Sequence, residues 1–182
     1  ALDYAAGRGL VETVQYLLPH AALNDDGRTL EFASIIRAVY ADDIAQLPEG
    51  KKLATVNRIS PENVSALHLA ANNGSVVMVE ALIKRGAHID LTNDNRQTPL
   101  HWAAWSNHPE LVAFLMRQGA NSDAQDVGGN TPLMLAVQNH STAAVEQLIV
   151  KGARKDIANN QGIRPIISAQ EKGYADIIAL LQ

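Results

Sequence analysis

Cysteine is absent from this chain of 182 residues, and aromatic residues make up only 4% of it. Without cysteine, the chain forms no disulfide bond and no thiolate metal site, and it carries no thiol redox chemistry. With so few aromatic rings, its core has to be built mainly from Leu, Ile, Val and Ala side chains. Such a core suits thin helical layers better than one large barrel or sandwich.

Net positive charge is also absent, because the formal net charge at pH 7 is −4. A nucleic-acid surface requires clustered Lys and Arg, so we expect no nucleic-acid partner. The same balance argues against an anionic membrane surface, and no apolar run approaches the ~20 residues of a membrane-spanning helix. Apolar residues nevertheless make up 47% of the chain, which predicts a globular fold rather than a disordered one.

What the chain does contain is an internal repeat. Similar residues recur in five columns at a constant step of 33 residues. The columns are Leu67, Leu100, Leu133 and Ile166; Ala70, Ala103, Ala136 and Ala169; Val79, Val112, Val145 and Ile178; Leu82, Leu115, Leu148 and Leu181; and Gly86, Gly119 and Gly152. A constant period of about 20–50 residues indicates a solenoid of stacked units.

Each unit is predicted to contain two short helices. Thr98 followed by Pro99 is a helix start, because threonine caps the first turn and proline fits its first position. The second helix carries Val112, Leu115 and Met116 at the spacing of one buried face. Gly119 then ends this helix, where a left-handed backbone is favoured.

Segments 98–104 (TPLHWAA) and 117–120 (RQGA) resemble the ankyrin repeat. This resemblance implies an all-α fold, an ankyrin-repeat solenoid of stacked helix pairs with hairpin-like loops projecting to one side. It also implies that the loops and the first helices form a concave surface that binds a protein partner.

The step of 33 residues sets the expected boundaries of the units. We expect ankyrin repeats at 60–92, 93–125 and 126–158, followed by a C-terminal capping repeat at 159–182. In the capping repeat, Arg164 and Ile167 replace the usual Thr and His, which is typical of a terminal unit.

Residues 1–59 are interpreted as degenerate N-terminal ankyrin-like units with an irregular insertion. The segment 42–60 lacks both the Thr-Pro start and the Gly-Ala end of the other units. It is either a tolerated insertion or decayed repeat, or a feature specific to one partner.

The expected concave positions are rich in Asn and Gln, which both donate and accept hydrogen bonds. Such a surface suits the backbone and polar groups of a protein better than phosphate. Trp105 should be partly exposed, because its column contains Asn72 and Gln138, and Trp is frequent at binding hot spots. The expected partner-binding residues are Trp105, Asn72, Asn73, Asp94, Gln97, Ser106, Asn130, Gln138 and Asn139.

These residues also have an interpretation that involves no partner. Asn and Asp are typical of solvated turns, and Trp105 could instead pack over a neighbouring layer. Trp102 shares a column with Leu69, so we expect it to be buried.

No catalytic constellation is found in the sequence. In the ankyrin family, the column of His68 and His101 is structural, and its ring bonds near the residue that starts the helix. None of His88, His108 and His140 has a carboxylate or a second histidine at metal-ligand spacing, and there is no nucleophile elbow or phosphate-binding loop. We therefore expect no enzyme, no cofactor and no metal site.

The sequence favours a protein-binding scaffold, acting as an adaptor or an inhibitor and existing as a monomer. One alternative is the substrate-recruiting repeat region of a larger enzyme or bacterial effector whose catalytic domain lies outside this chain. Another is a purely structural spacer. A cytoplasmic location is expected, with a bacterial periplasm or a secreted effector as alternatives.

Overall fold

The computed structural model of the chain describes residues 28–50, 56–57 and 63–182. Our interpretation of residues 1–27 lies outside these ranges. Within them, all regular structure is helical. The elements are α2 (Arg28–Ala41), η1 (Ile44–Gln46), α3 (Ala66–Asn73), α4 (Val76–Lys84), α5 (Pro99–Trp105), α6 (Pro109–Arg117), α7 (Pro132–Gln138), α8 (Thr142–Val150), α9 (Pro165–Lys172) and α10 (Ala175–Leu181).

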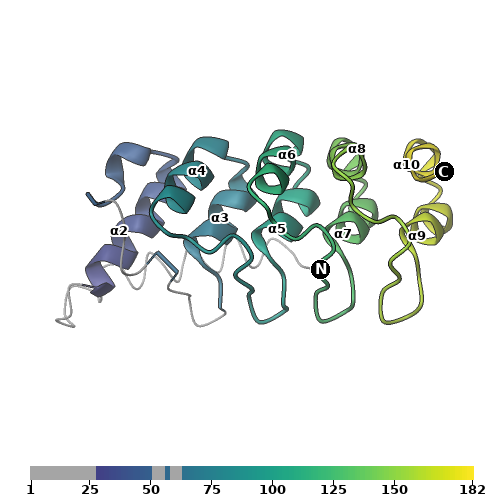
Figure 1. Ribbon diagram of the computed structural model, residues 1–182, viewed down its shortest axis with the longest axis horizontal. Helices are drawn as coiled ribbons and strands as arrows, with labels where there is room; N and C mark the ends of the chain where they lie inside the picture. Colours follow the sequence, from purple (N-terminus) through teal and green to yellow (C-terminus); the bar gives the residue numbers. More distant parts are fainter. Residues whose placement is uncertain (1–27, 51–55, 58–62) are drawn as a thin grey trace.

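The helices from α3 onward form consecutive pairs that are stacked side by side. Figure 1 shows α3, α5, α7 and α9 in one row and α4, α6, α8 and α10 in a second row above it, with the connecting loops projecting below the first row. Each helix packs against its counterpart in the next pair, as α5 does against α7 and α6 against α8. We call the first row the inner helices, the second row the outer helices and each pair a layer. This arrangement confirms the expected all-α solenoid.

The inner helices begin where the Thr-Pro pattern predicts. Helix α5 begins at Pro99 after the N-cap Thr98, and α7 begins at Pro132 after the N-cap Thr131. The Thr131 hydroxyl accepts a hydrogen bond of 3.2 Å from the backbone N–H of Met134. This bond satisfies a donor that the helix itself leaves unpaired.

The turn between the inner and outer helix of each layer needs a residue in the left-handed region. Asn107 and His140 occupy this position with φ of 56° and 55°, where the first and last pairs have glycine. Asparagine tolerates this conformation better than most residues. The Asn107 Oδ1 also accepts a hydrogen bond of 3.0 Å from the backbone N–H of Ala144 in the next layer, so the turn helps to join two layers.

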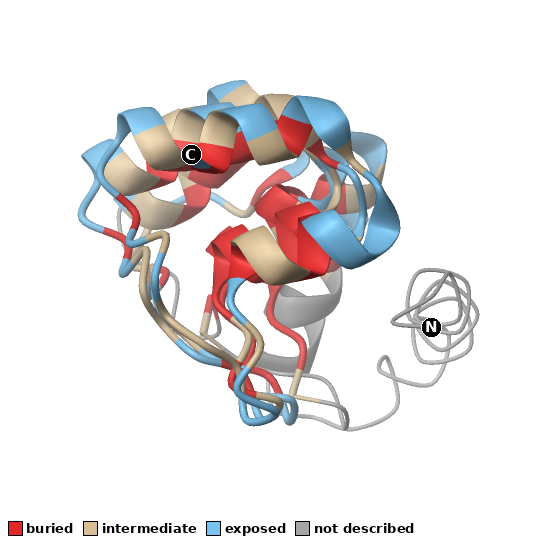
Figure 2. Cartoon of the chain, turned by 90° about the vertical axis from the view of Figure 1, so that its right-hand side faces the viewer, coloured by how far each residue is buried: buried red, intermediate tan, exposed pale blue. Residues whose placement is uncertain are grey.

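The core lies between the two rows and between successive layers. In Figure 2, buried residues lie on the sides of the helices that face each other, and exposed residues lie on the outside. Leu82, Leu115 and Leu148 are 0% exposed, because their own layer and the next one cover them. In the last layer Ile166 and Ile178 are only half-buried, because no further layer of the described chain covers them.

The last layer also carries a polar residue where the others are apolar. Gln170 is exposed, whereas the equivalent residues Ala71, Ala104 and Val137 are buried. A polar residue at an otherwise buried stacking position is typical of a capping layer in a solenoid.

The projecting loops are hairpins that share one closing bond. A backbone N–H at the start of each hairpin donates to the carbonyl four residues later. These bonds join Asn93 to Gln97 (3.1 Å), Asp126 to Asn130 (3.0 Å) and Asn159 to Ile163 (2.9 Å).

Neighbouring hairpins are joined to each other at their tips. The N–H of Val127 donates to the carbonyl of Asn95 at 2.9 Å, and the N–H of Asn160 donates to the carbonyl of Gly128 at 3.0 Å. The hairpins are therefore held as one continuous row rather than as independent loops.

A side chain near each hairpin bonds to the backbone of the next layer. Asp90 accepts a hydrogen bond of 3.0 Å from the N–H of Asn121, and Asp123 accepts one from the following layer in the same way. Asn57 accepts an equivalent bond of 2.7 Å from the N–H of His88. Asn57 therefore keeps a position of the repeat although it lies in the segment 42–60, which the sequence marks as irregular.

The layer that precedes α3 departs from the repeat in its outer half. Helix α2 packs against α3 as an inner helix would. The short 3-10 helix η1, of three residues, follows where the next layers have α-helices of nine residues. Asp43 caps η1 by accepting a hydrogen bond of 2.9 Å from the N–H of Ala45. The exact limits that we expect for the N-terminal units stay a prediction. None of the described helices is long and apolar enough to cross a bilayer.

We predict that Leu115→Ala and Leu148→Ala each lower the free energy of unfolding by about 2–5 kcal/mol, because each leaves a cavity between layers. Val150→Ala is the control, since Val150 is 68% exposed and its loss should stay below about 0.5 kcal/mol. Chemical denaturation followed by circular dichroism measures all three. A loss below about 1 kcal/mol for both leucine variants would contradict this packing.

We also predict unequal effects of alanine at two equivalent hairpin positions, Gly129 and Gly162, which both have φ of 76°. A Cβ at Gly129 would lie 2.6 Å from the backbone nitrogen of Asn160, whereas at Gly162 it would meet nothing within 4 Å. Gly162→Ala should therefore cost only the backbone strain of about 1–2 kcal/mol. Gly129→Ala should cost clearly more, because the next hairpin must move. Equal losses in denaturation experiments would contradict the close approach of the hairpins.

Candidate functional site

The C-terminal ends of α3, α5 and α7 form one surface across three layers. Because the repeat is 33 residues long, the residues that end each inner helix line up from layer to layer. We call this surface the inner-helix face. Its members are Asn72, Asn73, Trp105, Ser106, Gln138 and Asn139.

Hydrogen bonds between layers hold this face in place. The Ser106 hydroxyl donates to Asn72 Oδ1 at 3.0 Å, and Asn139 Nδ2 donates to the carbonyl of Trp105 at 2.8 Å. Asn73 Nδ2 reaches the carbonyl of Val39 in α2 at 3.3 Å. The amides that we predicted as partner contacts therefore also join each layer to the previous one.

Trp105 lies at the centre of the face. It is half-buried, which confirms the partial exposure that we expected from its column. Its carbonyl accepts hydrogen bonds of 2.8 Å from Asn139 and from the Ser141 hydroxyl. Its indole N–H, in contrast, has no hydrogen-bond partner among the described residues.

The expectation that Trp102 is buried is wrong, because Trp102 is half-buried. Its ring meets the ring of His68 edge-on, with centroids 5.5 Å apart, and its indole N–H donates to Gln97 Oε1 at 3.2 Å. The indole is larger than the leucines that fill this column in the neighbouring layers, Leu69 and Leu135. It therefore extends beyond the space that buries them.

Gln97 does not belong to the accessible surface on which we placed it. It is 3% exposed, and its Oε1 accepts hydrogen bonds from Trp102 and from Asn93 Nδ2. Its backbone N–H donates to Asn93 Oδ1 at 2.9 Å. Gln97 therefore closes its own hairpin and supports Trp102, which leaves it unable to contact a partner.

The two remaining predicted residues lie on the hairpins rather than on the inner helices. Asp94 is exposed and accepts a hydrogen bond from Asn63 of the preceding layer. Asn130 is half-buried, and its Oδ1 accepts hydrogen bonds from Gln138 at 3.3 Å and from Asn159 at 3.2 Å. Asn130 thus links the third hairpin to the inner-helix face.

The buried histidines have the structural role that we expected. The backbone N–H of Ser65 donates to His68 Nδ1 at 3.2 Å, so Nε2 carries the proton and donates to the carbonyl of Gln97 at 2.9 Å. His101 makes the equivalent bonds to Thr98 and to the carbonyl of Asn130. Each ring therefore ties a helix start to the hairpin of the next layer.

Burial of these two rings disfavours their charged form. It lowers the pKa of His68 to about 4 and also lowers the pKa of His101 below its ordinary value. Both rings are therefore neutral at pH 7, and every ring nitrogen is already in a hydrogen bond. Neither histidine is available to move a proton.

A surface contact that sequence spacing did not reveal joins the last two layers. His140 Nε2 lies 3.0 Å from Asp176 Oδ1, and the Thr142 hydroxyl donates to Asp176 Oδ2 at 2.6 Å. The bonds from Thr142 and His140 lower the pKa of Asp176 to about 2. The His140 ring also stacks on Tyr174, with centroids 4.0 Å apart. The partners are 36 residues apart, so only the register of the repeat could have indicated this contact.

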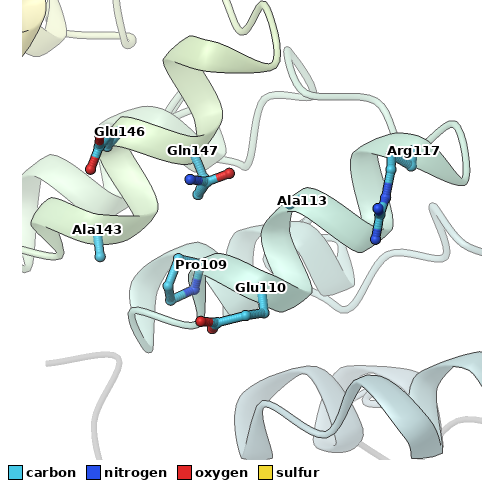
Figure 3. Close-up of a pocket in the computed structure, with 7 residues that line it drawn as sticks. All are labelled: Pro109, Glu110, Ala113, Arg117, Ala143, Glu146 and Gln147. Atoms are coloured by element: carbon cyan, nitrogen blue, oxygen red, sulfur yellow. The ribbon is translucent and has the colours of Figure 1, made fainter.

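On the opposite side of the molecule, a hollow of about 460 Å³ lies between the outer helices α6 and α8 (Figure 3). It forms because Ala113 and Ala143 are small and because Gln147 stands where the neighbouring layers have Phe114 and Leu180. The other lining residues are Pro109, Glu110, Arg117 and Glu146. In the described part of the chain, no three His, Asp or Glu side chains gather closely enough to hold a metal ion.

A family model described as Ankyrin repeats (3 copies) matches residues 35–126 and 118–182. The two matched ranges together span every layer from α3 to α10 and the C-terminal half of α2. A search of the curated proteins gives no match.

We predict that the free energy of unfolding falls as the pH drops below about 6.5. Burial holds the folded-state pKa of both His68 and His101 below the ordinary value of 6.5, with the pKa of His68 at about 4. The unfolded chain therefore binds more protons at these two residues as the pH falls below 6.5. Each histidine then removes up to about 1.4 kcal/mol per pH unit. Urea denaturation at several pH values measures this slope.

The control for this prediction is His101→Met, because Met134 occupies the same column in the next layer. This variant should show a shallower pH dependence than the parent between pH 6.5 and 5. An unchanged slope would mean that His101 does not take up a proton on unfolding.

Proposed function

Because this chain belongs to the ankyrin-repeat family, whose repeats are generally protein-binding modules, we propose that its inner-helix face binds a protein partner. In this proposal the chain acts as an adaptor or as an inhibitor of that partner. Trp105 is the observation that carries the proposal. Its half-buried ring lies among polar residues and contributes an indole N–H that the described fold does not use.

The surroundings of Trp105 support this role. The amides on both sides of the ring are fixed by bonds between layers, so the face is ordered before a partner arrives. A preordered surface loses little conformational entropy on binding. A large ring surrounded by polar groups is also the usual composition of a binding hot spot.

The hairpins extend the proposed contact beyond the inner helices. Asp94 is exposed and Asn130 is half-buried at the neighbouring hairpin, so both are placed at the rim of the surface. Gln97 is left out, because its side chain is buried. The proposed partner-binding set is therefore Asn72, Asn73, Asp94, Trp105, Ser106, Asn130, Gln138 and Asn139.

We predict that Trp105→Ala weakens the complex with a captured partner by about thirtyfold or more, equivalent to about 2 kcal/mol. The partner is first obtained by affinity capture from the native source, and its affinity is then measured by titration calorimetry. Glu146→Gln is the control, because Glu146 is exposed on the outer helix α8 and should leave the affinity unchanged. If Glu146→Gln weakens binding and Trp105→Ala does not, the partner uses the outer face.

The two proposed roles differ in what they do to the partner. An inhibitor covers the partner's functional surface, so adding the chain should lower the partner's own activity. An adaptor leaves that activity intact and binds a second protein through another surface. Assaying the captured partner with and without the chain therefore separates the roles.

A further inference from the structure

Over α3, α5 and α7 the inner-helix face contains no ionisable side chain, whereas the equivalent positions of α9 are Glu171 and Lys172. Its six members are Asn, Gln, Ser and Trp residues, which are neutral at every physiological pH. A neutral face gives no attraction to phosphates, to acidic segments or to basic segments. The groups that it fits best are therefore uncharged.

The bonds between layers also leave a defined set of free groups on this face. Trp105 Nε1 and Asn72 Nδ2 are donors with no partner among the described residues, because the bonds of Asn72 use only its Oδ1 and its carbonyl. These two donors lie on adjacent inner helices, α5 and α3. They are available to two acceptors of a bound segment that spans adjacent layers.

The two Trp residues of α5 differ in whether their indole N–H is already bonded within the fold. The two rings lie three residues apart on α5, and both are half-buried. The indole N–H of Trp102 is already bonded to Gln97, whereas that of Trp105 is free. Of the two indole N–H groups, only that of Trp105 can therefore donate to a bound molecule without breaking a bond of the fold.

The separation of the layers limits the conformation of the bound segment. Packed helices lie about 8–10 Å apart, and α3, α5 and α7 lie side by side in this way (Figure 1). A polyproline II segment rises about 3.1 Å per residue with three residues per turn, so the same side returns every ~9.3 Å. In a β-strand the same side returns about every 6.6 Å, which does not match the layers.

The hydrogen bonding favours the same conformation. Helices and paired strands already use their backbone carbonyls internally. A polyproline II segment has no internal hydrogen bonds, so each of its carbonyls is free to accept one.

We propose that the inner-helix face binds an uncharged segment of the partner protein in the polyproline II conformation, laid across α3, α5 and α7. Trp105 Nε1–H donates to one backbone carbonyl of the segment, and Asn72 Nδ2–H donates to the carbonyl three residues away. The Trp105 ring packs against the apolar side of the segment. This inference rests on the proposed function and specifies which part of the partner is recognised.

The test uses the whole chain labelled with ¹⁵N and the blocked peptide acetyl-(Ala-Pro-Pro)4-amide as the probe. The chain has two Trp residues and therefore two indole N–H signals, which Trp102→Phe and Trp105→Phe assign. The Trp105 signal reports on the face, and the Trp102 signal is the internal reference. We expect a saturable shift of the Trp105 signal and little change of the Trp102 signal. The affinity should change by less than about threefold between low and high salt, because no charges are involved.

Two controls make the test specific. The flexible peptide acetyl-(Gly-Ser-Gly)4-amide has the same length and no charge, but it is not preorganised, so it should bind at least about fivefold more weakly. Trp105→Phe keeps an aromatic ring and removes the donor, so it should weaken binding of the Ala-Pro-Pro peptide by about fivefold or more, as expected for one hydrogen bond. Trp102→Phe should leave that affinity within about twofold.

The inference is overturned if the Ala-Pro-Pro peptide causes no saturable shift, if both peptides bind equally, or if Trp105→Phe binds like the parent. These results would leave the proposed function standing, because that function requires only that a captured partner depends on Trp105. Conversely, if the Trp105→Ala variant binds the captured partner as tightly as the parent does, the proposed function itself is contradicted.

Discussion

No helix pair in the described part of the chain buries its apolar side chains by itself, and the rest of the structure depends on this constraint. Leu115 and Leu148 are 0% exposed because a layer lies on each side of them. In the last described layer, Ile166 and Ile178 remain half-buried, although the residues at the equivalent positions of the other layers are buried. The neighbouring layer is therefore the source of most of each layer's stability, as in other solenoids. The bonds from Asp90 and Asp123 to the following backbone fix the register in which this burial occurs.

The same constraint produces the candidate binding surface. Stacking at a constant step places the ends of α3, α5 and α7 beside one another, so three separate sequence segments form one face. The polar residues of that face have two tasks, because some of their groups bond to the neighbouring layer and others remain free. Trp102 and Trp105 show this division most clearly. One indole N–H supports the hairpin through Gln97, and the other is left for a bound molecule.

The fold was predictable from the sequence because burial between layers repeats with the chain. The leucine and alanine columns predicted the stacking, and the Thr98-Pro99 pair predicted where α5 begins. The site was predictable only in part. A column indicates where a side chain lies in the layer, but not which hydrogen bonds that side chain makes. For this reason the sequence placed Gln97 on the surface although Asn93 and Trp102 hold it in a buried position. The His140–Asp176 contact was missed for a related reason, since it joins two layers and has no short spacing.

The double role of the amides decides how substitutions on this face should be understood. Asn139 holds the carbonyl of Trp105, so replacing Asn139 changes both the joint between two layers and the position of the ring. A loss of binding in that variant would not show that Asn139 touches a partner. The Trp105 indole N–H makes no bond within the described fold, so removing it alters the surface and leaves the joints between layers intact. Among the members of the face, the Trp105 donor is therefore the group whose removal separates recognition from stability most directly.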